Sequence, residues 1–345
     1  MTKVALALAI SWGGLFLAAS PAAAQQDFSR WEDLFSDHPA EFRASGGITS
    51  YLERPVRSQD ADFSLLEEEF AVSGLVYQDD HEDLRLSAGV RHEGIRTGAI
   101  LPDTGLPFPD ELWNVNLGAS YRYLFESGLV LGGTVGVGSA SDEPFHSSHE
   151  IVGSVTVFTK VPAGERDSWF FAISYSNNRE YANAYPIPVI EYLYNPSADF
   201  HLMVGFPMEF LEWRPAPDWR FRVTYALIHN IHALLSYEVD DGLRAYVGYD
   251  WTAQGYLLVD RPDPKDRFFY EEMRAKGGFR FDLGAGWSLD LSSGYAFDRH
   301  YSQSQSGLRN SFDVVEIEGG LYGLVSLEWR VGNARPRYHP PPKSP

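Results

Sequence analysis

The stretch from Trp113 to Phe125, WNVNLGASYRYLF, alternates between apolar and polar side chains with a period of two. Its apolar face comprises Trp113, Val115, Leu117, Ala119, Tyr121, Tyr123 and Phe125. The positions between them are mostly polar or small, for example Asn114, Asn116 and Arg122. Because successive side chains of a β-strand point to opposite faces, this pattern predicts a strand between an apolar and a polar environment.

The same alternation recurs along most of the chain, and its last occurrence puts Ile317, Leu321, Val325 and Val331 on one face. The other alternating segments are Phe42–Leu52, Leu66–Val76, Leu84–His92, Leu129–Val137, Ile151–Val161, Trp169–Tyr175, Phe200–Phe206, Trp219–Leu227, Ile231–Val239, Leu243–Trp251, Phe269–Phe281 and Trp287–Phe297. Together they predict about 14 strands, within roughly 12 to 16 because a segment such as Ile187–Tyr194 could be another. An even number is typical of a bacterial barrel.

The connections between these segments alternate between short and long. Short turns rich in Gly, Asp and Pro are expected at Gln78–Glu82, Glu126–Gly128, Pro162–Asp167, Asp240–Gly242 and Gly284–Gly286, with a longer turn at Pro207–Asp218. Longer polar loops are expected at Arg54–Asp62, Arg96–Glu111, Ser139–Glu150, Arg179–Asp199, Thr252–Arg267 and His300–Val315. Short turns at one end and long loops at the other are typical of a transmembrane antiparallel up-and-down β-barrel. We therefore predict an all-β barrel over residues 42–331.

Aromatic residues near both ends of the apolar faces support a membrane location. Trp169, Trp219 and Trp287 fall near the short turns, whereas Trp113 and Trp251 fall near the long loops. Amphipathic rings gather at both membrane–water boundaries, so two belts are expected. The alternative, a soluble β-sandwich, would bury its aromatic residues in the middle of its strands.

Composition narrows the partners and the chemistry. The chain has 345 residues, with 28 basic and 47 acidic residues and a net charge of −19, which argues against nucleic acid as a partner. It has no cysteine, which excludes disulfides and thiolate sites.

Three segments outside the predicted barrel have sequence patterns of other kinds. The first 24 residues combine Lys3, an apolar run and a small-residue end at Ala22–Ala24, which predicts a signal peptide; a membrane anchor is the alternative. Residues 25–41 carry Phe28, Trp31 and Leu34 at helical spacing and predict a short periplasmic segment with a helix that caps or enters the lumen; the alternative is a helix that rests on the membrane interface. Residues 332–345 are rich in proline and predict a disordered tail.

The polar face of the strands identifies the side chains that would line the lumen. An acidic group comprises Glu67, Glu69, Glu316, Glu318 and Glu328. A basic group on other strands comprises Arg220, Arg222, Arg244, Arg274, Lys276 and Arg280. Opposed acidic and basic walls would create a transverse field in a water-filled pore; alternatively, these charges pair across a filled lumen.

No motif points to catalysis, a cofactor or a metal. The cluster His146–Glu150 contains Ser and His but matches no nucleophile motif. His229 and His232 lack a third metal ligand, and Asp79–Asp83 lacks the glycine-spaced loop of a calcium site. We therefore expect no enzymatic activity, no cofactor and no metal.

From Phe42 to Val331 the chain resembles bacterial outer-membrane β-barrels, in particular families built on domains of unknown function. The resemblance rests on the alternation, on Gly205-Phe206-Pro207 with Trp213 and Pro215, and on the last strand through Gly323, Val325, Leu327 and Trp329. It implies residence in the bacterial outer membrane, with lipid and the barrel assembly machinery as partners, but no active-site residue. The predicted function is a narrow pore or transporter for small solutes. The alternatives are a structural or surface-binding barrel with a closed lumen and a lipid-modifying enzyme.

Overall fold

The structure is a computed structural model that describes residues 41–332 except 180, 227–229, 262 and 306–310. The predicted signal peptide lies outside the described residues, as do nearly all of segments 25–41 and 332–345.

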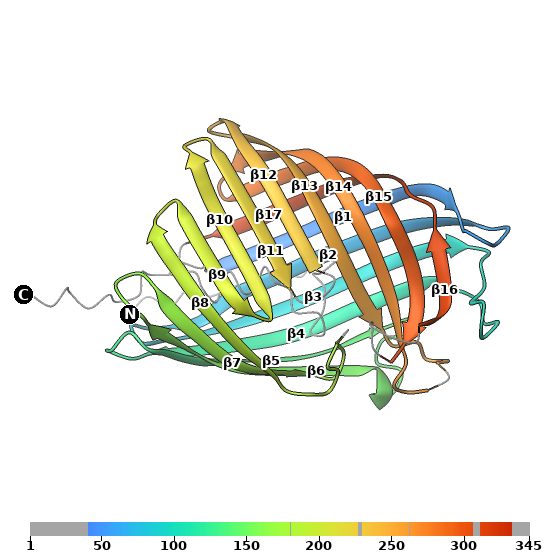
Figure 1. The fold of residues 1–345 in the computed structure, drawn as a ribbon, viewed down its shortest axis with the longest axis horizontal. Helices are drawn as coiled ribbons and strands as arrows, with labels where there is room; N and C mark the ends of the chain where they lie inside the picture. Colours follow the sequence, from blue (N-terminus) through green and yellow to red (C-terminus); the bar gives the residue numbers. More distant parts are fainter. Residues whose placement is uncertain (1–40, 180, 227–229, 262, 306–310, 333–345) are drawn as a thin grey trace, which may run out of the picture.

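Seventeen antiparallel strands in the described chain form one continuous sheet (Figure 1). The first nine are β1 (Phe42–Pro55), β2 (Asp62–Gln78), β3 (Glu82–Thr97), β4 (Glu111–Leu124), β5 (Val130–Ser141), β6 (Ile151–Pro162), β7 (Ser168–Ser176), β8 (Ile187–Ser197) and β9 (Phe200–Phe206). The others are β10 (Met208–Ala216), β11 (Trp219–Ala226), β12 (Asn230–Asp240), β13 (Leu243–Tyr256), β14 (Arg267–Gly284), β15 (Trp287–Ser304), β16 (Phe312–Ile317) and β17 (Gly320–Val331).

The sheet closes into a barrel because β1 pairs with β17, from Phe42 opposite Val331 to Tyr51 opposite Tyr322. β16 and β17 both pair with β15 and follow one another along it, so they share one position in the wall. Over the described residues the barrel therefore has 16 strand positions. Closure pairs the two ends of the sheet with each other, as a lipid environment requires.

The predicted number of about 14 strands is too low by two. The strands it lacks are β8, expected within a loop, and β10, expected within the Pro207–Asp218 turn. Pro188 and Pro196 interrupt β8, while Glu209 and Glu212 put charges on both faces of β10. These residues hide the alternation, although the backbone pairing remains regular from Met208↔Ala226 to Trp213↔Phe221.

Strand length varies around the wall. β14 and β15 have 18 residues each, whereas β9 has 7 and β10 has 9. The connections at the end of the barrel where β2 joins β3 and β14 joins β15 are short, and we call this the turn end. We call the opposite end, where β3 joins β4 and β13 joins β14, the loop end. In outer-membrane barrels the turn end faces the periplasm.

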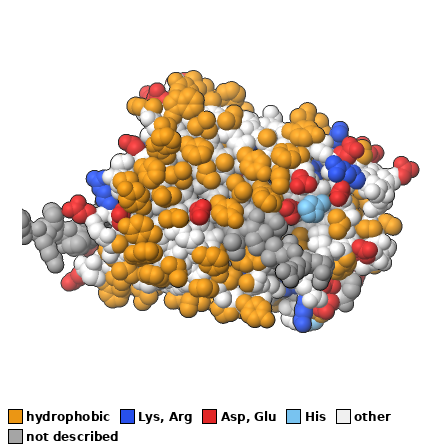
Figure 2. Space-filling view, in the orientation of Figure 1, with side chains coloured by type: hydrophobic (Ala, Val, Ile, Leu, Met, Phe, Trp, Pro, Cys, Tyr) orange, Lys and Arg blue, Asp and Glu red, His pale blue; other side chains and the backbone are white. Residues whose placement is uncertain are grey.

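The outer wall is apolar. Leu117, Val247 and Val325 are each more than half exposed although they lie well inside strands. On the face shown in Figure 2, hydrophobic side chains cover the wall and most charged side chains lie toward the two ends. Trp169, Trp219 and Trp287 are exposed at the turn end, as an interfacial belt requires. The chain is a β-barrel of the bacterial outer membrane.

Among the described residues, no helix is both long enough and apolar enough to cross a membrane.

Toward the loop end, the alternation between inward-facing and outward-facing side chains shifts by one residue in two neighbouring strands. Asp298 in β15 has a positive φ of 51°, and residues 318–319 separate β16 from β17. Ile317 was expected on the outer apolar face with Leu321, but it is buried inside the barrel. The break at 318–319 reverses the facing of the residues that precede it, which the uninterrupted alternation in the sequence does not reveal.

Candidate functional site

The lumen is the candidate site, and its loop end is filled by the segment between β3 and β4, residues 98–110. Phe108 packs against Phe63, Phe268 and Tyr301, with ring centroids 5.8, 5.5 and 5.0 Å away. Ala99 and Leu101 of the same segment join this buried cluster. We call residues 98–110 the plug segment. An apolar core inside the barrel mouth leaves little room for water at this level.

One carboxylate, that of Asp313 in β16, holds the plug segment in place. Its Oδ1 accepts hydrogen bonds from the backbone N–H groups of Asp103 and Thr104 at 2.7 and 2.9 Å. Its Oδ2 accepts from the Thr104 hydroxyl at 2.8 Å and from Gln303 Nε2 at 2.9 Å. Asp313 is fully buried, and these donors satisfy the charge that burial would otherwise make costly.

A second contact crosses the mouth and joins walls that lie far apart in the strand order. Leu257 N–H, just after β13, donates to Ala140 C=O in β5 at 2.8 Å. Val259 N–H donates to Asp142 Oδ1 at 2.9 Å. The loop between β5 and β6 is thereby tied to the loop between β13 and β14.

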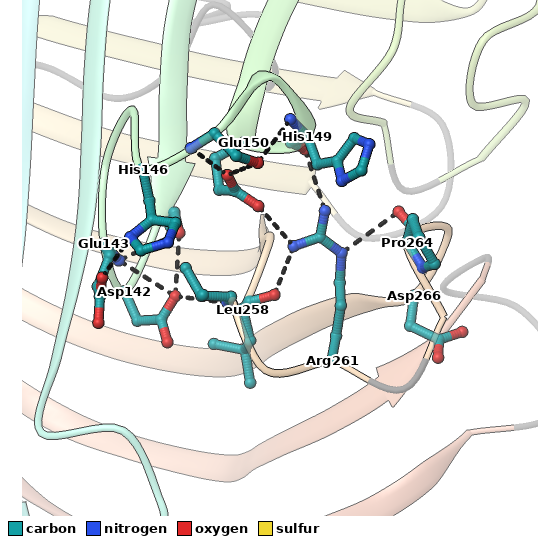
Figure 3. A network of polar contacts seen from close by, with 12 residues as sticks. Asp142, Glu143, His146, His149, Glu150, Leu258, Arg261, Pro264 and Asp266 are labelled. Atoms are coloured by element: carbon teal, nitrogen blue, oxygen red, sulfur yellow. Dashed lines mark hydrogen bonds and ion pairs between the residues drawn. The ribbon is translucent and has the colours of Figure 1, made fainter.

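Arg261 completes this tie, as Figure 3 shows. Its Nη1 lies 3.1 Å from Glu150 Oε1, and its Nη2 donates to His149 C=O at 3.0 Å. Glu150 ends the short 3₁₀ helix η1 (Ser148–Glu150), which Ser147 caps. Burial alone would raise the pKa of the Glu150 carboxyl, but hydrogen bonds from Ser147 and Arg261 outweigh burial and hold that pKa below its ordinary value.

Below the plug segment, a network of buried charges spans the lumen. Tyr51 in β1 donates to Glu272 in β14 at 2.7 Å, and Arg274 lies 3.3 Å from the same carboxylate and 4.0 Å from Glu67. Glu67 also accepts from Arg91 at 2.8 Å. Signs therefore alternate from wall to wall, and the charges compensate one another.

The network continues to a His–Asp pair. Asp250 Oδ1 lies 3.0 Å from His232 Nδ1, and its Oδ2 lies 2.6 Å from Lys276 Nζ. The His232 side chain is 44% exposed, whereas that of Asp250 is buried. Of His232, Asp250 and Lys276, His232 is therefore the most accessible to water.

The turn-end half of the lumen is richer in arginine. Glu212 in β10 contacts Arg214, Arg220 and Arg222, and Glu328 in β17 contacts Arg43, Arg280 and Arg330. Arg244 pairs with Glu238 between these groups, with Nε 2.8 Å from Oε1. The guanidinium groups of Arg43, Arg220, Arg222, Arg244 and Arg280 belong to side chains that are each about one-third exposed (30–35%).

The eleven side chains expected to line the lumen lie at three levels. Glu67, Glu69, Arg274 and Lys276 lie in the middle, and Arg220, Arg222, Arg244, Arg280 and Glu328 lie toward the turn end. Glu316 and Glu318 lie at the loop end, where they pair with Arg57 at 3.2 Å and Arg54 at 3.5 Å. The prediction that Glu316 lines the lumen is wrong, because the facing is reversed in β16: Val315 and Ile317 are buried inside the barrel, and Glu316 between them is exposed.

Other lumen residues were not singled out from the sequence. The most consequential is Glu212, which lies in the strand that the sequence pattern hides. Arg91 lies at an alternating polar position, so the period of two was the signal that could have found it.

The residues considered for catalysis or metal binding have ordinary partners. Ser147 Oγ donates to Glu150 at 2.6 Å, and His146 pairs with Glu143 at 2.7 Å on the exposed surface. Asp79 caps its own turn by accepting from the His81 and Glu82 N–H groups. His229 lies outside the described residues. Over the described ranges, no group of three or more His, Asp or Glu side chains is placed to hold a metal ion.

Comparison with known proteins gives structural likeness only. No protein-family model matches the chain, and no curated protein matches it in sequence. An outer-membrane channel from Pseudomonas putida F1 is 10% identical, with a TM-score of 0.37 over 84% of this chain and 96% of that one. The Pseudomonas putida toluene transporter TodX is 8% identical, with a TM-score of 0.35 over 84% and 90%.

OmpT of Vibrio cholerae also matches, at 7% identity and a TM-score of 0.31 over 85% of this chain and 98% of that one. The expectation of no enzymatic activity is wrong as it stands. OmpT lies beside channels among the matched barrels, and at 7–10% identity such matches leave catalysis open in either direction.

Proposed function

We propose that this barrel is a narrow pore or transporter that moves small solutes across the outer membrane. The observation that carries the proposal is that the two ends of the lumen differ. Its turn-end half is lined by arginines that are one-third exposed, and so reach water, whereas its loop end is constricted by the plug segment. A water-filled vestibule that leads to a constriction is suited to selective passage rather than to bulk flow.

The same proposal names the partners of the barrel. Outer-membrane lipid contacts the apolar wall, and the outer-membrane assembly machinery inserts the barrel. Small solutes are the transported partners. The packed cluster at the mouth also favours a second function, a structural or surface-binding barrel whose lumen stays closed.

Single-channel conductance in a planar bilayer distinguishes the two functions when the wild type is compared with a variant that lacks the Asp313 carboxylate, which holds the plug segment. Wild-type protein is expected to give small discrete steps. Asp313→Ala removes the acceptor of four hydrogen bonds to the plug segment and β15, so its steps are expected to be at least twice as large. Asp260→Ala, at an exposed position in another outer loop, is the control and should behave as wild type.

Silence from both the wild type and Asp313→Ala, in protein shown to be folded and inserted, would refute the pore and leave the closed barrel. Steps of equal size in all three proteins would show that the plug segment is not the constriction.

A further inference from the structure

We propose that the inner wall of the barrel binds small organic cations at Glu191 in β8. The ligands of this class carry an ammonium group on an apolar body. The inference rests on the proposed function, since it names a class of solute that the lumen would admit. The observation that carries it is a buried carboxylate in apolar surroundings, one oxygen of which has no hydrogen-bond partner among the described residues.

Glu191 is fully buried on the lumen side of the wall, where buried and exposed positions alternate along β8. It pairs with Gly205 of β9, and its carboxylate lies over that glycine, since a Cβ there would be 2.5 Å from Oε2. Its Oε1 accepts from the Met208 backbone N–H in β10 at 3.2 Å. One neutral donor does not offset the cost of burying an ionised carboxylate, so Oε2 remains available to a cationic partner.

Apolar side chains surround this carboxylate along the inner wall. They are Val189 and Ala172 toward the loop end, Leu193, Met203 and Phe210 toward the turn end, and Phe170 and Met208 beside Glu191. Together they belong to one cluster, in which Phe210 is partly buried and the others are buried. The wall therefore offers hydrocarbon surface on both sides of a single acidic group.

Two basic residues of neighbouring segments have other positions or partners. Lys160 of β6 lies opposite Phe170, which stands between it and Glu191 in the same row, and Lys160 has interactions of its own. Arg179, after β7, donates to the Ser174 carbonyl oxygen at 3.2 Å and to the Ser174 hydroxyl at 2.6 Å.

The remaining charged neighbours lie on β10 and β11. Arg222 is two rows closer to the turn end, where it pairs with Glu212 and lies over the Phe210 ring, 5.9 Å from its centre. Glu209 is on the outer face of β10 and is exposed. Its negative charge favours a cation at Glu191 and does not compete for one inside the lumen.

These surroundings select the ligand. An ammonium group supplies both the positive charge and the N–H donors that Oε2 lacks, and charge-assisted hydrogen bonds of this kind are strong. The apolar rows favour a cation with a hydrocarbon body, and Phe170 and Phe210 provide aromatic neighbours for it. A metal ion requires several ligands, and the described residues contain no group of three acidic or histidine side chains placed to hold one.

Titration calorimetry on the folded full-length protein in detergent measures the binding of two probes, benzylammonium and its neutral counterpart benzyl alcohol. Glu191→Gln removes the charge but keeps the size of the side chain and an oxygen that can accept from the Met208 N–H. Glu209→Gln is the matched control, because it removes a nearby carboxylate from the opposite face of the wall.

Wild-type protein is expected to bind benzylammonium at least about tenfold more tightly than benzyl alcohol, a comparison that depends on no variant. Glu191→Gln should bind benzylammonium roughly tenfold more weakly, since it loses a charge-assisted hydrogen bond. Glu209→Gln should match the wild type. Absent binding, equal affinity for the two probes in the wild type, or equal weakening in both variants overturns the site.

Single-channel conductance of the same proteins separates this inference from the proposed function. A channel that conducts without binding benzylammonium leaves the pore standing and removes the site. Selective binding of benzylammonium by a protein that does not conduct leaves the site standing and removes the pore.

Discussion

Arginine has different roles along the lumen, and exposure separates them. Arg299 is completely buried, with its guanidinium 4.5 Å from the centre of the Tyr51 ring, and it therefore acts as part of the packing. Arg220 and Arg280 have the same charge but remain one-third exposed. The first kind stabilises the fold, and the second kind is accessible from the lumen.

Glu150 is a residue whose charge state should control the tie across the barrel mouth. Because its folded-state pKa is depressed, the ionised carboxylate stabilises the tie fully above the ordinary value of 4.5. That contribution is lost as the pH falls through the depressed value. Hydrogen exchange should therefore show weaker protection at Leu257 and Val259 at about pH 3 than at pH 7.

Glu150→Gln should remove that pH dependence and lower the local stability by about 1–3 kcal/mol at pH 7, because it leaves the Arg261 charge buried without its carboxylate. Glu143→Gln affects an exposed pair with His146 and serves as the control. Unchanged protection in Glu150→Gln would mean that the backbone bonds alone maintain the tie.

At the scale of elements, the turn between β14 and β15 depends on glycine. Gly284, Ala285 and Gly286 all have positive φ angles, and a Cβ on Gly286 would lie 1.9 Å from the Arg330 carbonyl oxygen. Gly286→Ala should cost about 1–3 kcal/mol, measured by urea unfolding in lipid vesicles.

Gly323 in β17 is the matched control, since a Cβ there meets nothing within 4 Å. Gly323→Ala should leave the unfolding midpoint unchanged. Equal loss in both variants would mean that the cost comes from replacing glycine in general, not from this turn.

How far the sequence predicts these elements depends on what interrupts the alternation. Strands such as β4 are visible because most inward positions are polar or small and most outward positions are apolar. β10 is not, since Glu212 and Glu209 fall on opposite faces. The reversal near Ile317 is equally hidden, because a residue added to the backbone changes the facing without changing the letters around it.

The candidate site, too, could be predicted from the sequence only in part. The period of two predicts that Arg220, Arg222 and Arg280 share a face, because facing depends on neighbours in the chain. It does not predict their partners, since Tyr51 and Glu272 are 221 residues apart and meet only because the barrel closes. The plug segment was missed for a similar reason: its apolar residues read as parts of an exposed loop.

At the scale of the whole molecule, the outer wall should tolerate charge only near its ends. Val247 lies in the middle of β13 and Val239 lies near the end of β12, next to the turn, and both are exposed. Val247→Arg should destabilise the inserted barrel by about 2–4 kcal/mol, and Val239→Arg by about 0–1 kcal/mol.

Reversible unfolding in phospholipid vesicles measures both changes, and unfolding in detergent micelles provides the comparison. Similar costs at the two positions would contradict a lipid-facing wall with a defined midplane.

The unequal strand lengths have a consequence for the membrane itself. A strand needs about 9–11 residues to cross the hydrocarbon layer at the usual tilt, so β9, with 7 residues, is shorter than the layer, while β14 and β15 exceed it. Such hydrophobic mismatch is relieved by thinning the bilayer beside the short strands or by leaning the barrel axis. The lipid surrounding this protein is therefore expected to be thinner beside β9 and β10 than on the far side, which gives the barrel a distinct front and back in the plane of the membrane.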